Sequence, residues 1–151
     1  AFKLASLHKA RIIHRDVKPA NIIANGNQGG IHGVHLVDFG LSIQARGEQE
    51  GTVEFRAPEQ DLERQRNITA ATDVFGLGQT AWQLLVGEPR RFRYNKDYTD
   101  WESEEPPMLP AFVPPRLIGE LEKATAFNPG KRHGRAAAFA QALKSIGQSI
   151  K

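Results

Sequence analysis

Apolar residues recur at helical spacing in the middle of the chain, behind Asp73 and in front of Gly87. These residues are Val74, Leu77, Ala81, Leu84 and Leu85. Side chains three and four positions apart lie on one face of a helix, and glycine commonly follows a last helical turn. The pattern therefore predicts a helix that opens at Asp73 and ends before Gly87.

Three further segments show helical spacing. Residues 2–9 have the pattern of the last turns of an amphipathic helix. Residues 116–127 and 135–146 each carry an apolar stripe. The stripes consist of Leu117, Ile118, Leu121 and Ala124, and of Ala136, Phe139, Ala140, Leu143 and Ile146. The second half of the chain is therefore expected to be mostly helical.

Residues 21–40, NIIANGNQGGIHGVHLVDFG, have a different pattern. They predict two short strands around a glycine-rich turn, with Asn25-Gly26 as the hairpin signal. Residues 41–59 are polar and irregular, and residues 88–116 are rich in proline and charge, which predicts a long loop with room for a short helix. The expected fold is a single α+β domain, mainly helical, with one short hairpin.

Composition narrows the class of protein. The chain has 151 residues, of which 40% are hydrophobic and 25% charged, as expected for one folded domain with a core. It contains no cysteine, which excludes disulfides and cysteine-rich metal sites. No apolar run could span a bilayer and no secretory signal is present, so we expect no membrane partner and, by default, an intracellular, cytoplasmic location.

The net charge of +3 permits an anionic ligand without requiring nucleic acid. The basic clusters RRFR (90–93) and KRHGR (131–135) come without an aromatic stacking platform or a groove-reading motif. We therefore interpret them as solvated surface and expect no nucleic-acid partner.

Polar groups flank the predicted hairpin on both sides. Asp16 and Asn21 precede its first strand and Asp38 follows its second. A tight hairpin brings these three residues together at its open end. Carboxylate and amide oxygens suit Mg²⁺, which binds few protein ligands together with water and phosphate oxygens. Lys18 adds a cation of the kind that contacts phosphate. A solvated turn, or a salt bridge in the core, remains the alternative for any one of these residues.

Five motifs in the same order resemble the protein kinase family, and together they cover most of the chain. The first three correspond to the catalytic loop, the metal-binding turn and the end of the activation segment. They are HRDVKPAN (14–21), DFG (38–40), GTVEFRAPE (51–59), DVFGLG (73–78) and NPGKRHG (128–134). The resemblance implies the large, mainly helical lobe of a kinase, with a short β-hairpin at the catalytic loop.

The resemblance implies catalytic roles for three residues. Asp16 would accept or orient the proton of the substrate hydroxyl. Lys18 would contact the transferred phosphate, and its place two residues after Asp16 is typical of serine/threonine kinases. Thr52 would bond to Asp16 and Lys18 and help to seat a serine or threonine of a protein substrate.

The resemblance also implies ATP and Mg²⁺ as cofactors. Asn21 and Asp38 would be the metal ligands, Lys18 would reach the phosphates and Ile23 would lie beneath the adenine. Other matching residues have structural roles in the family: Glu59 and Arg132 resemble a buried ion pair, and Asp73 would bond to the backbone near His14 and Arg15.

The chain departs from the family in one large respect. The glycine-rich loop, the strand lysine and its glutamate partner are not found in residues 1–151. We therefore expect residues 1–151 to be a partial kinase domain, with the large lobe present and the small lobe absent. Two hypotheses follow: a fragment of a serine/threonine kinase, inactive by itself, or a catalytically silent, pseudokinase-like module that docks a protein partner.

Overall fold

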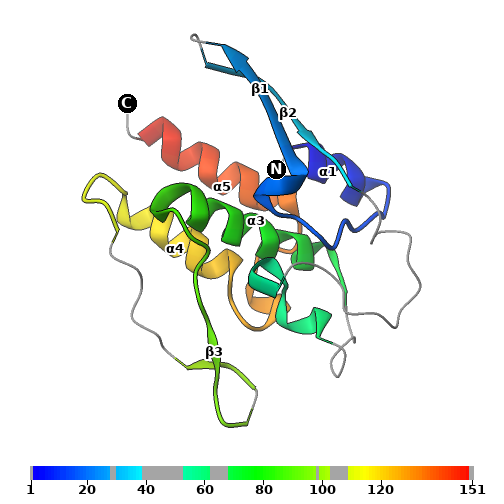
Figure 1. Ribbon diagram of the computed structural model, residues 1–151, viewed down its shortest axis with the longest axis vertical. Helices are drawn as coiled ribbons and strands as arrows, with labels where there is room; N and C mark the ends of the chain where they lie inside the picture. Colours follow the sequence, from blue (N-terminus) through cyan, green and yellow to red (C-terminus); the bar gives the residue numbers. More distant parts are fainter. Residues whose placement is uncertain are drawn as a thin grey trace.

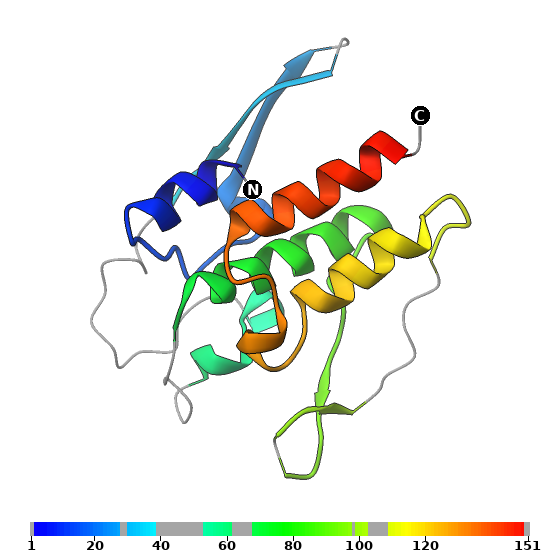
Figure 2. The same ribbon diagram turned by 180° about the vertical axis from the view of Figure 1, so that it is seen from behind.

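The computed structural model describes residues 2–27, 30–38, 53–61, 68–97, 99–102 and 109–149. Within them, α3 (Ala70–Val86) lies beside α4 (Pro115–Ala124) and α5 (Ala136–Ser149), as both views show (Figures 1 and 2). Helix α1 (Phe2–Lys9) packs against α5. The predicted α+β fold with mainly helical structure is confirmed. No helix in these ranges is both long enough and apolar enough to cross a membrane.

Helix α3 begins three residues earlier than the sequence pattern indicated. Thr69 is its N-cap: the Thr69 hydroxyl accepts from the backbone N–H of Ala71 (3.3 Å), and the backbone N–H of Thr69 donates to Oγ1 of Thr72 (3.1 Å). The helix ends at Gly87, as predicted, where φ is +89°. This left-handed conformation favours glycine, because glycine has no Cβ atom. Asp73 therefore lies inside the first turn and is available for tertiary contacts.

Two apolar clusters hold the helices together. The larger joins α3, α4 and α5 through Val74, Trp82, Leu121, Ala124 and Phe139. The smaller joins α1, the loop after it and α5 through Leu4, Val17 and Ala136. The second cluster anchors the loop at residues 10–21 on the helical layer.

Strands β1 (Ile22–Asn27) and β2 (Gly30–Leu36) form the predicted antiparallel hairpin, which projects from the helices (Figure 1). The predicted turn position was wrong, because Asn25 and Gly26 lie inside β1 and the register shifts between them. A Cβ on Gly26 would lie 2.6 Å from the carbonyl oxygen of Gly30. This glycine therefore permits close strand pairing at a bulge rather than a turn.

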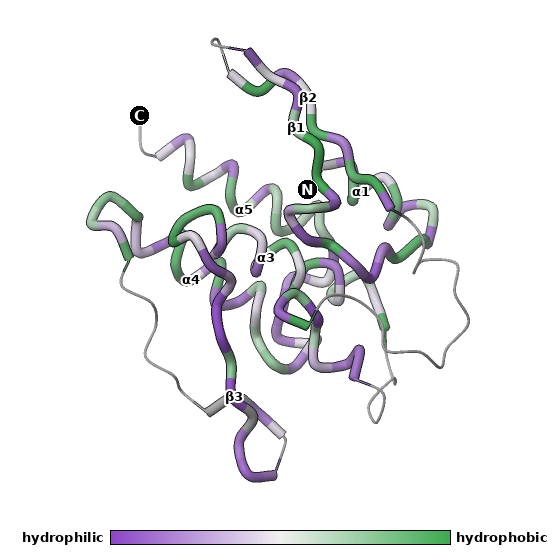
Figure 3. The backbone as a smooth tube through the Cα atoms, in the orientation of Figure 1, coloured by the Kyte–Doolittle hydropathy of each residue, from purple (hydrophilic) through white to green (hydrophobic). Residues whose placement is uncertain are grey.

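The remaining elements are short. They are the 3₁₀ turns η1 (Pro19–Asn21), η2 (Val53–Phe55), η3 (Pro58–Gln60) and η4 (Pro129–Lys131), and the paired strands β3 (Arg93–Tyr94) and β4 (Trp101–Glu102). In the described part of residues 88–116 before α4, β3 and β4 replace the short helix for which the sequence left room. They lie on a largely hydrophilic arm (Figure 3). Residues 39–52, which include Thr52 and the last two residues of DFG, lie outside the described residues.

Candidate active site

The loop of residues 14–21 is fixed to α3 by one buried carboxylate. Asp73, 1% exposed, accepts the backbone N–H of His14 at Oδ2 (2.9 Å) and that of Arg15 at Oδ1 (2.8 Å). Arg15 has φ of +69°, a conformation that non-glycine residues seldom adopt. The predicted contacts of Asp73 are thus confirmed. They hold a strained backbone directly before Asp16.

Asp16 lies at the centre of a polar cluster. Its carboxylate, buried at 8% exposure of the residue, receives Nζ of Lys18 (2.8 Å) and Nδ2 of Asn21 (3.0 Å), both at Oδ2. Nδ2 of Asn21 also donates to the backbone carbonyl of Asp16 (2.8 Å). Two donors on one oxygen favour the ionised form of the carboxylate and fix its orientation. The structure therefore brings together three of the residues that the sequence indicated.

His14 has a structural place within the loop. It is fully buried; Nε2 donates to the carbonyl of Val37 (3.0 Å) and Nδ1 accepts the backbone N–H of Asp16 (3.3 Å). A neutral imidazole with its proton on Nε2 satisfies both bonds. His14 thereby links the loop to the chain just beyond β2.

Asp38 lies next to the same loop. The backbone N–H of Val37 donates to the carbonyl of Asn21 (2.9 Å), so the two ends of the hairpin meet as predicted. Asp38 is exposed and has φ of +61°. Asp38 and Asn21 offer oxygen atoms of the kind that Mg²⁺ prefers. Nδ2 of Asn21 donates to Asp16, so Oδ1 is the atom of this amide that would bind a metal. This donor set fits Mg²⁺ shared with phosphate. Among the described residues, no cluster of three or more His, Cys, Asp or Glu side chains could hold a metal by itself.

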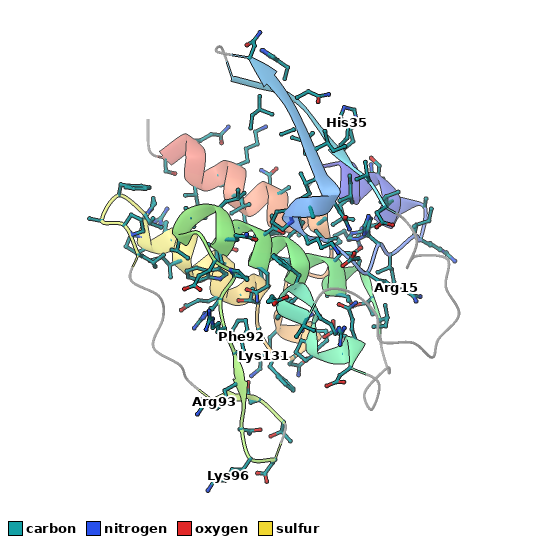
Figure 4. All side chains as sticks on the ribbon, in the orientation of Figure 1. Arg15, His35, Phe92, Arg93, Lys96 and Lys131 are labelled. Carbon is teal, nitrogen blue, oxygen red and sulfur yellow. The ribbon has the colours of Figure 1, made fainter. Side chains whose placement is uncertain are left out.

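Ile23, the residue expected beneath an adenine, is on β1 and 48% exposed. Its partner across the hairpin is His35 (labelled in Figure 4), so both side chains lie on one face of the hairpin. An apolar side chain exposed on this face is compatible with a stacking base. The placement of Thr52 lies outside the described residues.

The sequence did not reveal Gln60. Its Nε2 donates to the carbonyl of Arg15 (2.7 Å) and its Oε1 accepts the N–H of Ala57 (2.9 Å). The side chain is 2% exposed and joins the segment around η3 to the catalytic loop. Only its position directly after the motif at 51–59 could have drawn attention to it, because buried polar residues follow no periodic pattern.

Glu59 and Arg132 form the buried ion pair that the sequence indicated. Nη1 of Arg132 donates to Oε1 of Glu59 (2.7 Å) and Nη2 donates to Oε2 (2.9 Å). The two side chains are 5% and 0% exposed. The pair ties the segment at η3 to the loop before α5.

The basic cluster at 90–93 is partly engaged within the fold. The Arg90 guanidinium lies over the rings of Trp82 (5.5 Å) and Phe92 (5.2 Å) and pairs with Glu122 (3.7 Å). Arg93 lies on the projecting arm (Figure 4). These contacts of Arg90 are therefore all within the fold.

Comparisons with known proteins agree with this geometry. The family described as "Protein kinase domain" matches residues 3–125. The chain is 32% identical to the serine/threonine-protein kinase Pkn1 of Myxococcus xanthus, over 93% of this chain and 22% of that protein. It is 33% identical to PknB of Mycolicibacterium smegmatis, over 86% and 22% respectively. The crystal structure of the PknI kinase domain of Mycobacterium tuberculosis matches with a TM-score of 0.64 and 31% identity, over 96% of this chain and 51% of that one.

This chain belongs to the protein kinase family. The relatives Pkn1 and PknB bear the name serine/threonine-protein kinase. The chain spans about a fifth of the length of the first two of these relatives and about half of the PknI kinase-domain chain.

Proposed function

We propose that the protein carrying this chain transfers the phosphoryl group of Mg-ATP to serine or threonine hydroxyls of protein substrates. The observation that supports this most is the buried Asp16 carboxylate with Lys18 Nζ at 2.8 Å and Asn21 Nδ2 at 3.0 Å. A base, a phosphate-binding cation and a metal ligand then share one loop. We infer that residues 1–151 constitute the large lobe, a partial kinase domain.

Asp16 orients the attacking hydroxyl and accepts its proton. Phosphoryl transfer depends mainly on positioning and on stabilising charge. The two donors at Oδ2 hold the carboxylate in one orientation, and Asp73 holds the backbone on which Asp16 stands. Lys18 extends from the same loop and neutralises charge on the phosphoryl oxygens while it remains beside Asp16.

Asn21 and Asp38 are the residues that would hold Mg²⁺, and Thr52 would bond to Asp16 and Lys18. When bound, the ion offsets negative charge on the phosphates and holds them in place. Ile23 supplies an apolar surface for the base. These assignments rest on the resemblance and on the chemistry of the side chains.

The test is the substitution Asp16→Asn in the complete protein. Asparagine keeps the size and can still accept at its oxygen, but it is not a base, so kcat should fall by roughly 10²–10⁴-fold while the melting temperature changes little. Turnover of a peptide substrate is measured together with thermal unfolding. A folded variant with near-normal kcat would refute the role of Asp16.

The alternative, a catalytically silent module that docks a protein partner, predicts a different result. The unsubstituted complete protein would then show no phosphoryl transfer, and the Asp16→Asn variant would bind the partner as before. Because Asp16, Lys18, Asn21 and Asp38 all have the side chains that the reaction needs, catalysis is the function the site supports best.

A further inference from the structure

His8, on the last turn of α1, has a buried side chain that contacts Asp73, the residue that holds the loop before Asp16. Its side chain is 4% exposed, and its two ring nitrogens have different partners. Nε2 lies 2.8 Å from Oδ2 of Asp73, and Nδ1 accepts the backbone N–H of Ala136 at 3.3 Å. His8 thus lies between α3 and the first residue of α5, which are far apart in sequence but adjacent in both views (Figures 1 and 2).

The partners determine which nitrogen of His8 carries the proton. A backbone N–H can only donate, so Nδ1 must accept from Ala136. A carboxylate accepts, so Nε2 must carry the hydrogen that is donated to Asp73. The ring is therefore a neutral imidazole in the Nε2–H form, fixed from both sides.

The bond to Ala136 has a clear cause. The first N–H groups of a helix have no acceptor within the helix, and Ala136 is fully buried. A buried N–H without an acceptor is costly, so the His8 ring is held firmly against the end of α5. This fixes the point from which Nε2 approaches Asp73.

The bond to Asp73 completes a set of three donors on one carboxylate. Oδ2 accepts from His14 N–H and from His8, while Oδ1 accepts from Arg15 N–H. A carboxylate rotates about one bond, so a third donor from another element restricts its plane. The plane of Asp73 in turn sets the backbone of His14 and Arg15, where φ of Arg15 is +69° and Asp16 follows.

We propose that His8 is a positioning residue for catalysis: held by the N–H of Ala136 at the start of α5, it orients Asp73, and Asp73 holds the loop that carries Asp16. His8 does not touch substrate or cofactor. The kinetic part of this inference rests on the proposed kinase function, whereas the state of the His8 ring does not.

Three substitutions in the complete protein separate the two bonds. His8→Phe removes both, and kcat should fall by about 10–100-fold with the KM for Mg-ATP changed less than about threefold, because a small displacement of a catalytic group lowers the rate more than it lowers binding. His8→Gln places an amide nitrogen where Nε2 lies and should restore most of kcat. His8→Asn places its oxygen near Nδ1, keeps the Ala136 bond and should resemble His8→Phe in kcat. His32→Phe, at an exposed histidine of β2, is the matched control and should leave kcat unchanged.

The readouts distinguish positioning from simple stability. If the Phe variant folds and has normal kcat, or if Gln and Asn lower kcat equally and in proportion to their melting temperatures, the proposal is wrong. Should the Phe variant not fold, the Gln and Asn pair still decides it.

¹⁵N NMR of the imidazole nitrogens in residues 1–151 at neutral pH should show Nε2 protonated and Nδ1 not; a ring protonated on Nδ1 also overturns the proposal. An inactive Asp16→Asn variant with a correct His8 ring supports both inferences. Near-normal kcat in that variant refutes the role of Asp16, and an unsubstituted protein that transfers no phosphoryl group refutes the function but not the state of the His8 ring.

Discussion

At the scale of single residues, Arg132 shows how a buried charge is kept in this fold. Its five N–H donors all find acceptors: both carboxylate oxygens of Glu59 and the carbonyls of Ala71 (3.2 Å), Ala126 (2.6 Å) and Phe127 (2.8 Å). The guanidinium also lies 4.9 Å from the ring centre of Phe75. A buried guanidinium needs an acceptor for each N–H group, because burial removes the hydrogen bonds that these groups make to water.

Removal of Arg132 should therefore be severe. Arg132→Ala leaves the Glu59 carboxylate buried and without its counter-ion, which costs about 3–5 kcal/mol of unfolding free energy. Denaturant unfolding of residues 1–151 measures this. The matched control is Arg91→Ala, which removes an exposed pair with Glu88 (3.2 Å, side chains 82% and 58% exposed) and should change stability by less than about 1 kcal/mol. Equal losses in the two variants would show that Glu59 and Arg132 are solvated in solution.

At the scale of elements, glycines of α3 set how closely its neighbours approach. A Cβ on Gly76 would lie 2.6 Å from the carbonyl oxygen of Val17 and 2.9 Å from its Cβ. Val17 follows Asp16 directly, so α3 touches the backbone of the catalytic loop at this point. On another side, a Cβ on Gly78 would lie 2.8 Å from Cγ2 of Thr125, beyond the end of α4. Because Gly76 and Gly78 have no side chains, Val17 and Thr125 can approach α3 closely.

Gly76→Ala should therefore be harmful although alanine favours helices. Helix propensity alone would stabilise by about 1 kcal/mol. The obstacle is a backbone carbonyl of a loop fixed by Asp73, so it cannot move aside cheaply, and overpacking costs roughly 1–3 kcal/mol. We expect lower stability and, in the complete protein, lower kcat.

The control for Gly76 is Gly119→Ala in α4, where a Cβ meets no atom within 4 Å. Propensity should then dominate and raise stability by up to about 1 kcal/mol. Thermal unfolding of both variants is the measurement. A stabilised Gly76→Ala variant would mean that α3 and the loop lie farther apart than the 2.6 Å approach requires.

Elements with repeated patterns were predictable from sequence, whereas single contacts were not. Apolar stripes indicated α3, α4 and α5, and the end of α3 at Gly87 was correct. The start of α3 was wrong by three residues, because Asp73 resembles a cap but its carboxylate serves the catalytic loop, and Thr69 caps instead. The Asn25-Gly26 pair resembled a turn, but local preference gave way to a bulge within β1.

In the candidate site too, the sequence predicted local groupings but not single long-range contacts. Motif order predicted that Asp16, Lys18 and Asn21 belong to one loop, because a short spacing along the chain keeps them near. His8 and Gln60 act through bonds to Asp73 and to the Arg15 carbonyl, partners 65 and 45 positions away along the chain. Only the folded chain reveals such pairs, since a buried polar residue is identified by its partners rather than by its neighbours in sequence.

At the scale of the whole molecule, two of the residues proposed to contact nucleotide are open to solvent. Ile23 is 48% exposed and Asp38 is exposed. A cavity of about 700 Å³ is lined by Phe75 and Gln79 of α3, by residues 88–93, and by Val53, Glu54, Arg56, Ala57 and Asp61. Another of about 370 Å³ lies between α1, α3 and the hairpin. Neither cavity includes Asp16, Asn21, Ile23 or Asp38, so in the nucleotide site proposed above these residues would form one wall.

Residues 1–151 alone should therefore bind Mg-ATP weakly. Sites for small molecules usually bury most of the ligand, and a single wall leaves the base and much of the triphosphate in water. We expect a Kd of about 1 mM or weaker, on the order of 4 kcal/mol of binding free energy. Calorimetry sets the limit, and the methyl NMR signals of Ile23 at millimolar Mg-ATP report the contact itself. Asp38→Asn should abolish that shift, because it removes a carboxylate that the Mg²⁺-bound phosphates need, while His32→Phe should leave it. A micromolar Kd for residues 1–151 would show that the chain supplies more of the nucleotide site than Ile23, Asn21, Asp38 and Lys18 provide.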